Sequence, residues 1–220
     1  MAKIILVPTS HIASESVKKV ESVIEKEEPD CVAVELDINR FFAQRKGEGA
    51  SDSEVLKNIG FSSFLVYWTM KKLQNWLGKK TGILPGSEMM QAVKIAEKKK
   101  LTIAFIDRDI RQTFLRIQKI TTGEKLKLFW FLIKGIVIGS VWSKLSRQKI
   151  DLSKLPPKDM IDDAMSILRE EFPQLYKVLL TERNIFMVKK LEDLSTKFKK
   201  IVVVIGAGHY DGMKKLIDIM

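Results

Sequence analysis

Four short apolar runs, separated by long helical stretches, constrain the fold of this chain most strongly. The runs are IILV, CVAVEL, LTIAFI and IVVVIG, at residues 4–7, 31–36, 101–106 and 201–206. They are rich in β-branched residues and do not alternate strictly between apolar and polar positions, which is typical of strands buried on both faces of a sheet. We therefore predict an α/β fold with a mostly parallel or mixed central sheet covered by helices.

The segments between the runs predict the covering helices and the domain organisation. Residues 14–27 predict a helix that begins at a serine and ends before Pro29, and residues 86–100 predict a second crossover helix. The chain of 220 residues suits one domain. Residues 1–50, 85–116 and 197–220 are assigned to the sheet core, and residues 51–84 and 117–196 to largely helical insertions or cover. Helix breaks are predicted at Gly123, Pro156-Pro157 and Pro173.

The charge of the chain raises the question of an anionic partner. A formal net charge of +11 suits nucleic acid or an anionic membrane surface. The lysines, however, are spread over several predicted helices with glutamates among them, and no zinc finger, helix-turn-helix or RNP-like strand is recognisable. We expect a solvated basic surface and no nucleic-acid partner. The single cysteine, Cys31, fits a reducing compartment such as the cytoplasm.

Two aromatic segments are candidates for contact with a membrane or with a second subunit. LFWFLIKGIVIGSVW, at residues 128–142, carries Lys134 near its middle and is shorter than the roughly 20 residues of a spanning helix. We predict that it is a buried or interfacial helix. The aromatic-rich residues 51–78 predict an amphipathic helix that packs in the core or at a subunit interface. A homodimer is therefore expected.

The segment IGAGHYDG, at residues 205–212, has the glycine content of a dinucleotide-binding turn. Its spacing G-A-G-H-Y-D-G is one residue longer than G-x-G-x-x-G, and the eight residues that follow Gly212 leave no room for the second strand and its acidic ribose ligand. We predict no dinucleotide site here. We interpret the glycines as residues that let the backbone turn tightly at the end of a strand.

The two histidines of the chain, His11 and His209, both directly follow predicted strands. Ligands of open α/β sheets bind outside the carboxyl ends of the strands. Glu35 follows the second predicted strand and Arg108 the third, after Asp107. Such charges are costly to bury unless they are paired or bound to metal. The alternatives are a structural ion pair, for instance Glu35 with Arg108, and a metal site.

Three further charged residues are candidates for the same edge of the sheet. Glu88 lies in the first turn of a predicted crossover helix, where the helix dipole alone favours a carboxylate. Glu182 and Arg183 lie in the middle of the apolar helical stretch LLTERNIFM, from which either side chain could reach the crevice. Two imidazoles with one or two carboxylates would suit Mn, Co, Fe or Zn.

These segments together resemble the TraB family. The resemblance rests on PTSHIASESV, PDCVAVELDINR, GSEMMQAVKIAEKKKLTIAFIDRDIRQTFLR, LLTERNIFMVKKL and VVVIGAGHYDGM. It covers nearly the whole chain, and the motifs follow one another in the family's order. The family includes the bacterial pheromone-shutdown proteins and relatives of the Tiki metalloproteases, with erythromycin-esterase and ChaN-like proteins as remoter relatives.

The resemblance implies a divalent-metal hydrolase that acts on a peptide or other small acyl substrate. The implied metal ligands are His11, His209 and Glu35, and the metal would be Mn, Co or Zn. The implied catalytic residues are Glu35 and Arg108, with Glu88, Glu182 and Arg183 as accessory candidates. Glu35 or Glu88 would be the ligand or general base, and Arg108 would stabilise the oxyanion or hold a substrate carboxylate.

The resemblance also bears on location, and the chain departs from the family at one position. Many microbial members continue into C-terminal transmembrane helices, so we expect the soluble part of a membrane-associated protein, in the cytoplasm at the inner face of an anionic membrane. Pro8 stands where the family usually has the glycine of its first motif, which removes a backbone donor beside His11. The alternative function is a non-catalytic peptide-binding or membrane-adaptor module with a structural polar cluster.

Overall fold

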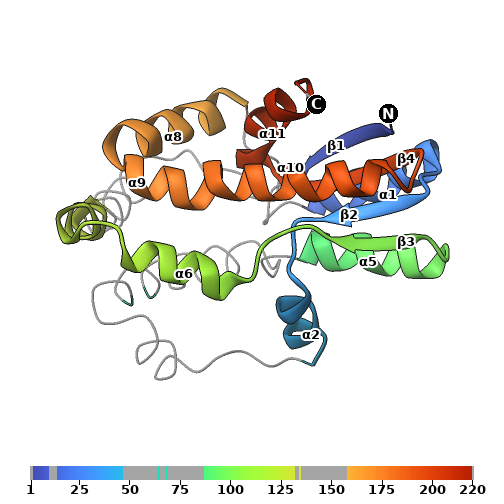
Figure 1. The fold of residues 1–220 in the computed structure, drawn as a ribbon, viewed down its shortest axis with the longest axis horizontal. Helices are drawn as coiled ribbons and strands as arrows, with labels where there is room; N and C mark the ends of the chain where they lie inside the picture. The colour runs from blue at the N-terminus through green and yellow to red at the C-terminus, as the bar shows by residue number, and fades with distance from the viewer. Residues whose placement is uncertain are drawn as a thin grey trace, which may run out of the picture.

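The fold is built around a parallel sheet. The computed structural model describes residues 2–9, 14–46, 64, 68, 87–131, 134 and 158–219, and Figure 1 shows its arrangement. Within these residues the strands are β1 (Lys3–Thr9), β2 (Cys31–Val34), β3 (Thr102–Phe105) and β4 (Lys200–Gly206). They pair in the order β1-β4-β2-β3, and every pair is parallel. Each strand coincides with one of the apolar runs, so the predicted α/β fold is confirmed.

The order of the strands brings distant segments of the chain to one edge of the sheet. The chain passes from β1 over the position of β4 to β2, continues to β3, and returns to place β4 between β1 and β2. β4 therefore has neighbours on both sides, and its six residues after Lys200 are all buried. Because the strands are parallel, the residues that follow β2, β3 and β4 all emerge at the carboxyl edge.

Helices α1 (Ser14–Glu27), α2 (Ile38–Lys46) and α5 (Ser87–Lys98) cover one face of the sheet. The first and third coincide closely with the predicted helices at residues 14–27 and 86–100. Alternate strand residues such as Val32 and Val202 pack there against Val20, Phe41 and Ala92. Alternation of side chains along each strand sends the intervening residues to the opposite face.

Helices α10 (Glu182–Ser195) and α11 (Tyr210–Ile217) cover that opposite face. Cys31, Ala33 and Val203 contact this layer, in which Met187 and Leu191 are fully buried. Burial raises the pKa of the Cys31 thiol to about 11, as expected for an inert core cysteine. α10 falls within the range assigned to insertion or cover, and it packs directly on the sheet.

A third cluster extends beyond the carboxyl edge of the sheet (Figure 1). Its elements are α6 (Ile110–Gln118), helical residues 122–131, α8 (Lys158–Glu171) and α9 (Pro173–Tyr176), and its buried side chains include Ile117, Leu128 and Phe172. The π-helical turn η1 (Lys177–Thr181) joins α9 to α10 without a break. One long helix therefore runs from this cluster back onto the sheet.

The predicted helix breaks have different outcomes. The break expected at Gly123 is wrong in position, because Gly123 lies inside a helix and the interruption falls at residues 119–121. Pro173 is the first residue of α9, where proline costs no hydrogen bond because the first amides of a helix have no partner within it. Pro156 and Pro157 lie outside the described residues, as do residues 51–78 apart from 64 and 68, and most of 128–142. No helix in the described part of the chain is both long and apolar enough to cross a membrane.

Candidate functional site

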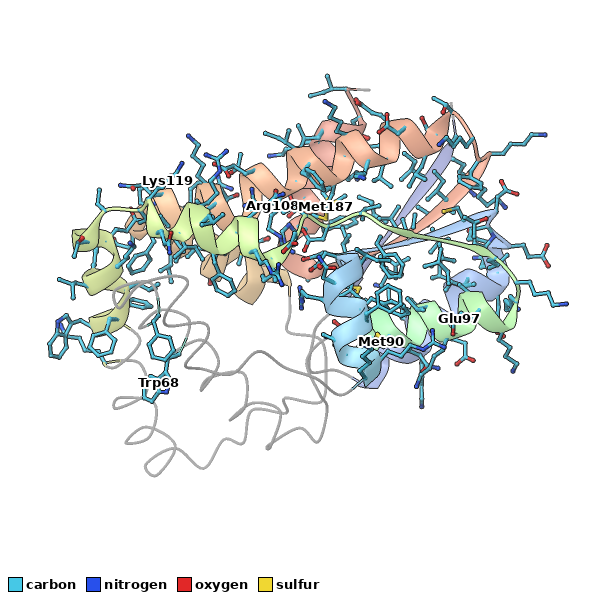
Figure 2. The ribbon with its side chains drawn as sticks, turned by 60° about the horizontal axis from the view of Figure 1, so that its bottom comes forward. Trp68, Met90, Glu97, Arg108, Lys119 and Met187 are labelled. Atoms are coloured by element: carbon cyan, nitrogen blue, oxygen red, sulfur yellow. The ribbon has the colours of Figure 1, made fainter. Side chains whose placement is uncertain are left out.

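Charged and polar side chains are buried together at the carboxyl edge of the sheet. Glu35 follows β2, Asp107 and Arg108 follow β3, and His209 ends the short helix η2 (Ala207–His209) after β4. Each of these four residues is less than one-tenth exposed. Figure 2 shows Arg108 at the end of the β3 segment, where the chain runs on into α6. The arrival of several ionisable groups at the strand ends makes this edge the candidate site.

Arg183, from the second position of α10, is the centre of the cluster. Its Nη2 donates to Glu35 Oε1 and, at 2.7 Å, to Asp107 Oδ2, while its Nε donates to Asp107 Oδ1 at 3.1 Å. Nη1 lies 3.1 Å from His209 Nε2 and donates to the carbonyl oxygen of Leu179 at 3.3 Å. The planar guanidinium suits this fork-like pairing with carboxylates. Arg183 thus links three strand ends through one side chain.

His209 is held at both of its ring nitrogens. Nδ1 lies 2.6 Å from Asn184 Oδ1, and Nε2 lies 3.1 Å from Glu35 Oε1. The other carboxylate oxygen of Glu35 accepts a hydrogen bond of 2.7 Å from the backbone N–H of Gly206. The imidazole is therefore fixed between α10 and the end of β2, and its orientation is set by buried partners.

Buried electrostatics control the ionisation of the cluster. Burial alone would raise the pKa of Glu35, but His209, Arg183 and the Gly206 N–H hold that pKa far below its ordinary value. Burial likewise opposes the charge of Arg183, whereas Glu35 and Asp107 raise its pKa above the ordinary arginine value. Glu35 is therefore a carboxylate and Arg183 a cation in the folded protein.

Acid should weaken the fold through Glu35. Its pKa is lowered on folding from an ordinary value of 4.5, so its stabilising contribution is complete above that pH and is lost progressively as the pH falls below it. We expect the urea midpoint to drop between about pH 5 and pH 3. The Glu35→Gln variant should start less stable and decline less steeply over this range. Parallel declines of the two proteins would contradict the assignment.

A second set of ionic contacts, centred on Arg108, lies beside the cluster around Arg183. Arg108 Nη1 donates to Glu182 Oε2 at 3.1 Å, Nη2 to the carbonyl of Val178 at 2.7 Å, and Nε to Thr113 Oγ1 at 3.1 Å. Val178 lies in the π-helical turn η1, as does Leu179, which accepts from Arg183. Single π-helical turns are frequent at functional sites. Here the turn supplies carbonyl acceptors to both arginines.

The structure brings together most of the predicted site residues, with different partners from those expected. Glu35 and His209 share one group with Arg183, and Arg108 pairs with Glu182. The structural alternative that paired Glu35 with Arg108 is therefore wrong in its partner, because Arg183 reaches Glu35 from α10. Glu88 is buried in the first turn of α5. His11 lies outside the described residues.

Asn184 was not predicted from the sequence, and Asp107 was noted only as a charge at the end of the third predicted strand. Asp107 provides both carboxylate oxygens to Arg183, and Asn184 contacts His209. A signal was present for Asn184, since it is a third polar residue directly after Glu182-Arg183 in an otherwise apolar helical stretch. Its partner, His209, lies 25 residues further along the chain, and no local pattern joins the two.

The glycines of IGAGHYDG have another structural role than the one expected. Gly206 has φ −63° and ψ 143°, a conformation open to any residue. Gly212 is required for space, because a Cβ atom there would lie 2.3 Å from Asn184 Nδ2. The glycine therefore permits close approach of α11 to α10 beside His209.

The donor atoms of this cluster do not fit a metal ion as they stand. Within the described residues, no group of three or more His, Cys, Asp or Glu side chains is placed to hold one. Glu35 and His209 direct their donor atoms at Arg183, Asn184, the Gly206 N–H and each other. The cation among the carboxylates is the guanidinium of Arg183. The predicted ligand His11 lies outside this description.

Comparison with known proteins assigns the family. The model of the TraB/PrgY/gumN family matches residues 2–220. An uncharacterized protein of Methanocaldococcus jannaschii is 35% identical over 97% of this chain and 53% of its own length. TraB domain-containing proteins of Bos taurus and Homo sapiens are 24% identical over 97% of this chain and 62% of their own length. The chain thus spans between half and two thirds of these relatives, and it belongs to the TraB/PrgY/gumN family.

Proposed function

We propose that this chain is a hydrolase of peptide or other small acyl bonds, of the TraB and Tiki type, with its active site at the carboxyl edge of the sheet. The observation that carries the proposal is the fixed imidazole of His209, whose Nε2 lies 3.1 Å from Glu35 while Nδ1 lies 2.6 Å from Asn184. A histidine oriented by one buried partner and paired with a carboxylate has the arrangement of a general base.

The arrangement of the side chains suggests a catalytic role for each of them. Once Arg183 Nη1 has moved away from His209 Nε2, Nε2 takes a proton from water, the water oxygen attacks the acyl carbon, and the proton passes to the leaving amine or alcohol as its bond to that carbon breaks. Glu35 stabilises the imidazolium formed in between. Arg108 is better suited to support, because each of its three nitrogens already donates to a protein acceptor. It ties the end of β3 to the π-helical turn.

A divalent metal remains a separate proposal. Mn, Co or Zn would need Glu35 and His209 as ligands, with His11 as a third, and would have to displace the guanidinium of Arg183 from between them. Repulsion between a bound cation and Arg183 would oppose this exchange. The catalytic roles given above are therefore assigned to side chains alone.

The decisive measurement is hydrolysis by the purified chain. A panel of mixed peptides and small acyl esters would be tested in chelator and, separately, with added Mn²⁺, Co²⁺ or Zn²⁺. We expect His209→Gln to lower kcat/KM by about 100-fold or more, while the exposed control Arg45→Gln retains full activity. Activity in chelator supports the side-chain mechanism, and activity only with a metal supports the metal proposal.

The alternative function is a non-catalytic peptide-binding or membrane-adaptor module. The completeness of the cluster favours it, since Arg183, Glu35 and His209 satisfy one another without any added group. Buried ionic groups of this kind also serve structure alone. If folded protein hydrolyses nothing in any of the arms above, the catalytic proposal fails and this alternative stands.

We also propose that the chain acts in the cytoplasm, at the inner face of an anionic membrane, as a homodimer. The net charge of +11 supports attraction to anionic lipid. Sedimentation with vesicles containing about one-third phosphatidylserine should fall steeply with salt. If light scattering gives the mass of a single chain at every protein concentration, the proposed homodimer is wrong.

A further inference from the structure

The contact between His209 and Asn184 determines where the imidazole carries its proton. His209 Nδ1 lies 2.6 Å from Asn184 Oδ1, and both residues are 5% exposed. An amide oxygen can only accept a hydrogen bond, so a contact this short requires a proton on Nδ1. In the neutral ring the second nitrogen, Nε2, is then the one without a proton.

We infer that Asn184 is a positioning residue that fixes the orientation of the His209 ring and keeps its proton on Nδ1. The other ring nitrogen, Nε2, faces Glu35 Oε1 and Arg183 Nη1, each at 3.1 Å. The contacts at Nε2 do not select a tautomer, because the Arg183 N–H donates to an unprotonated Nε2 whereas the Glu35 carboxylate accepts from a protonated one, so the inference rests on the contact at Nδ1. The catalytic meaning of this arrangement rests on the proposed function, whereas the tautomer itself is a property of the folded chain.

Gly212 in turn determines the position of Asn184. A Cβ atom at residue 212 would lie 2.3 Å from Asn184 Nδ2 and 3.5 Å from its Cγ. The amide nitrogen therefore occupies the space that the glycine leaves open on α11, and the amide oxygen is directed at His209. Asn184 and Gly212 act as one positioning device, assembled where α10 packs against α11.

Nuclear magnetic resonance of the imidazole nitrogens tests this inference directly. The chain has two histidines, so His11→Gln leaves His209 as the sole labelled residue in ¹⁵N-histidine protein. At about pH 8.5, where free histidine is neutral, we expect a proton on Nδ1. A proton found on Nε2 with a bare Nδ1 would overturn the inference, and this measurement requires no change at Asn184.

Three variants separate positioning from simple structural support. Asn184→Leu removes the acceptor and should lose the Nδ1 proton signal, and Gly212→Ala should do the same by displacing the amide. Asn184→Asp keeps an acceptor of similar shape and should restore the protonated Nδ1. A folded Asn184→Leu protein with the wild-type nitrogen spectrum would also refute the role. Absence of hydrolysis with a protonated Nδ1 would instead count against the proposed function alone.

Discussion

Replacement of Arg183 by methionine should destabilise the fold by about 3–5 kcal/mol, the usual cost of leaving buried charges without their partner. Methionine fills a similar volume but leaves Glu35 and Asp107 without the cation that faces both of them. Their side chains are only 5% and 3% exposed, so water cannot replace the lost partner. Urea unfolding at neutral pH measures the change, and the variant should regain part of its stability in acid.

Two matched proteins make this measurement specific. Arg45→Met removes an exposed ion pair with Glu97 and should change stability by less than about 1 kcal/mol. The double variant Arg183→Met with Glu35→Gln should lose less than the sum of the single changes, because it removes one of the charges left unpaired. An Arg183→Met protein as stable as Arg45→Met would contradict the central role assigned to this guanidinium.

Gly212→Ala should destabilise the fold by about 2–5 kcal/mol, from overpacking and from a broken buried hydrogen bond. The new methyl group would lie 2.3 Å from Asn184 Nδ2, closer than two heavy atoms can approach without a bond. Asn184 must therefore move, and its 2.6 Å contact with His209 is lost. Thermal and urea unfolding both report the change.

A second glycine provides a control substitution that should change the stability of the fold in the opposite direction. Gly123 is also helical, and a Cβ atom there would meet nothing within 4 Å. Gly123→Ala should therefore stabilise the fold by about 0.5–1 kcal/mol through helix propensity. If the two alanine variants behave alike, the tight approach of α11 to Asn184 is not what Gly212 provides.

The fold was largely predictable because its signal is local. Four runs of β-branched residues predict buried strands, and the helical segments between them predict a parallel sheet. The order β1-β4-β2-β3 was not predictable from these patterns. A strand buried on both faces is equally apolar at any interior position, so composition does not say that the last strand enters between the first two.

The candidate site was predictable in its location and less so in its contacts. Residues at the ends of parallel strands meet at one edge, which brought Glu35, Arg108 and His209 into consideration. The partner of each charge depends on how α10 lies across the sheet, and that is a matter of long-range packing. Arg183 therefore replaced Arg108 as the partner of Glu35.

The sequence by itself determined the strands, the helices beside them and the edge at which ionisable groups collect, because each follows from the periodicity of neighbouring residues. The tertiary structure alone decided that Arg183 lies between two carboxylates and an imidazole, and that Gly212 makes room for Asn184. These contacts join residues from 26 to 148 positions apart. Their energies depend on burial and distance, which arise only when the helices have packed on the sheet.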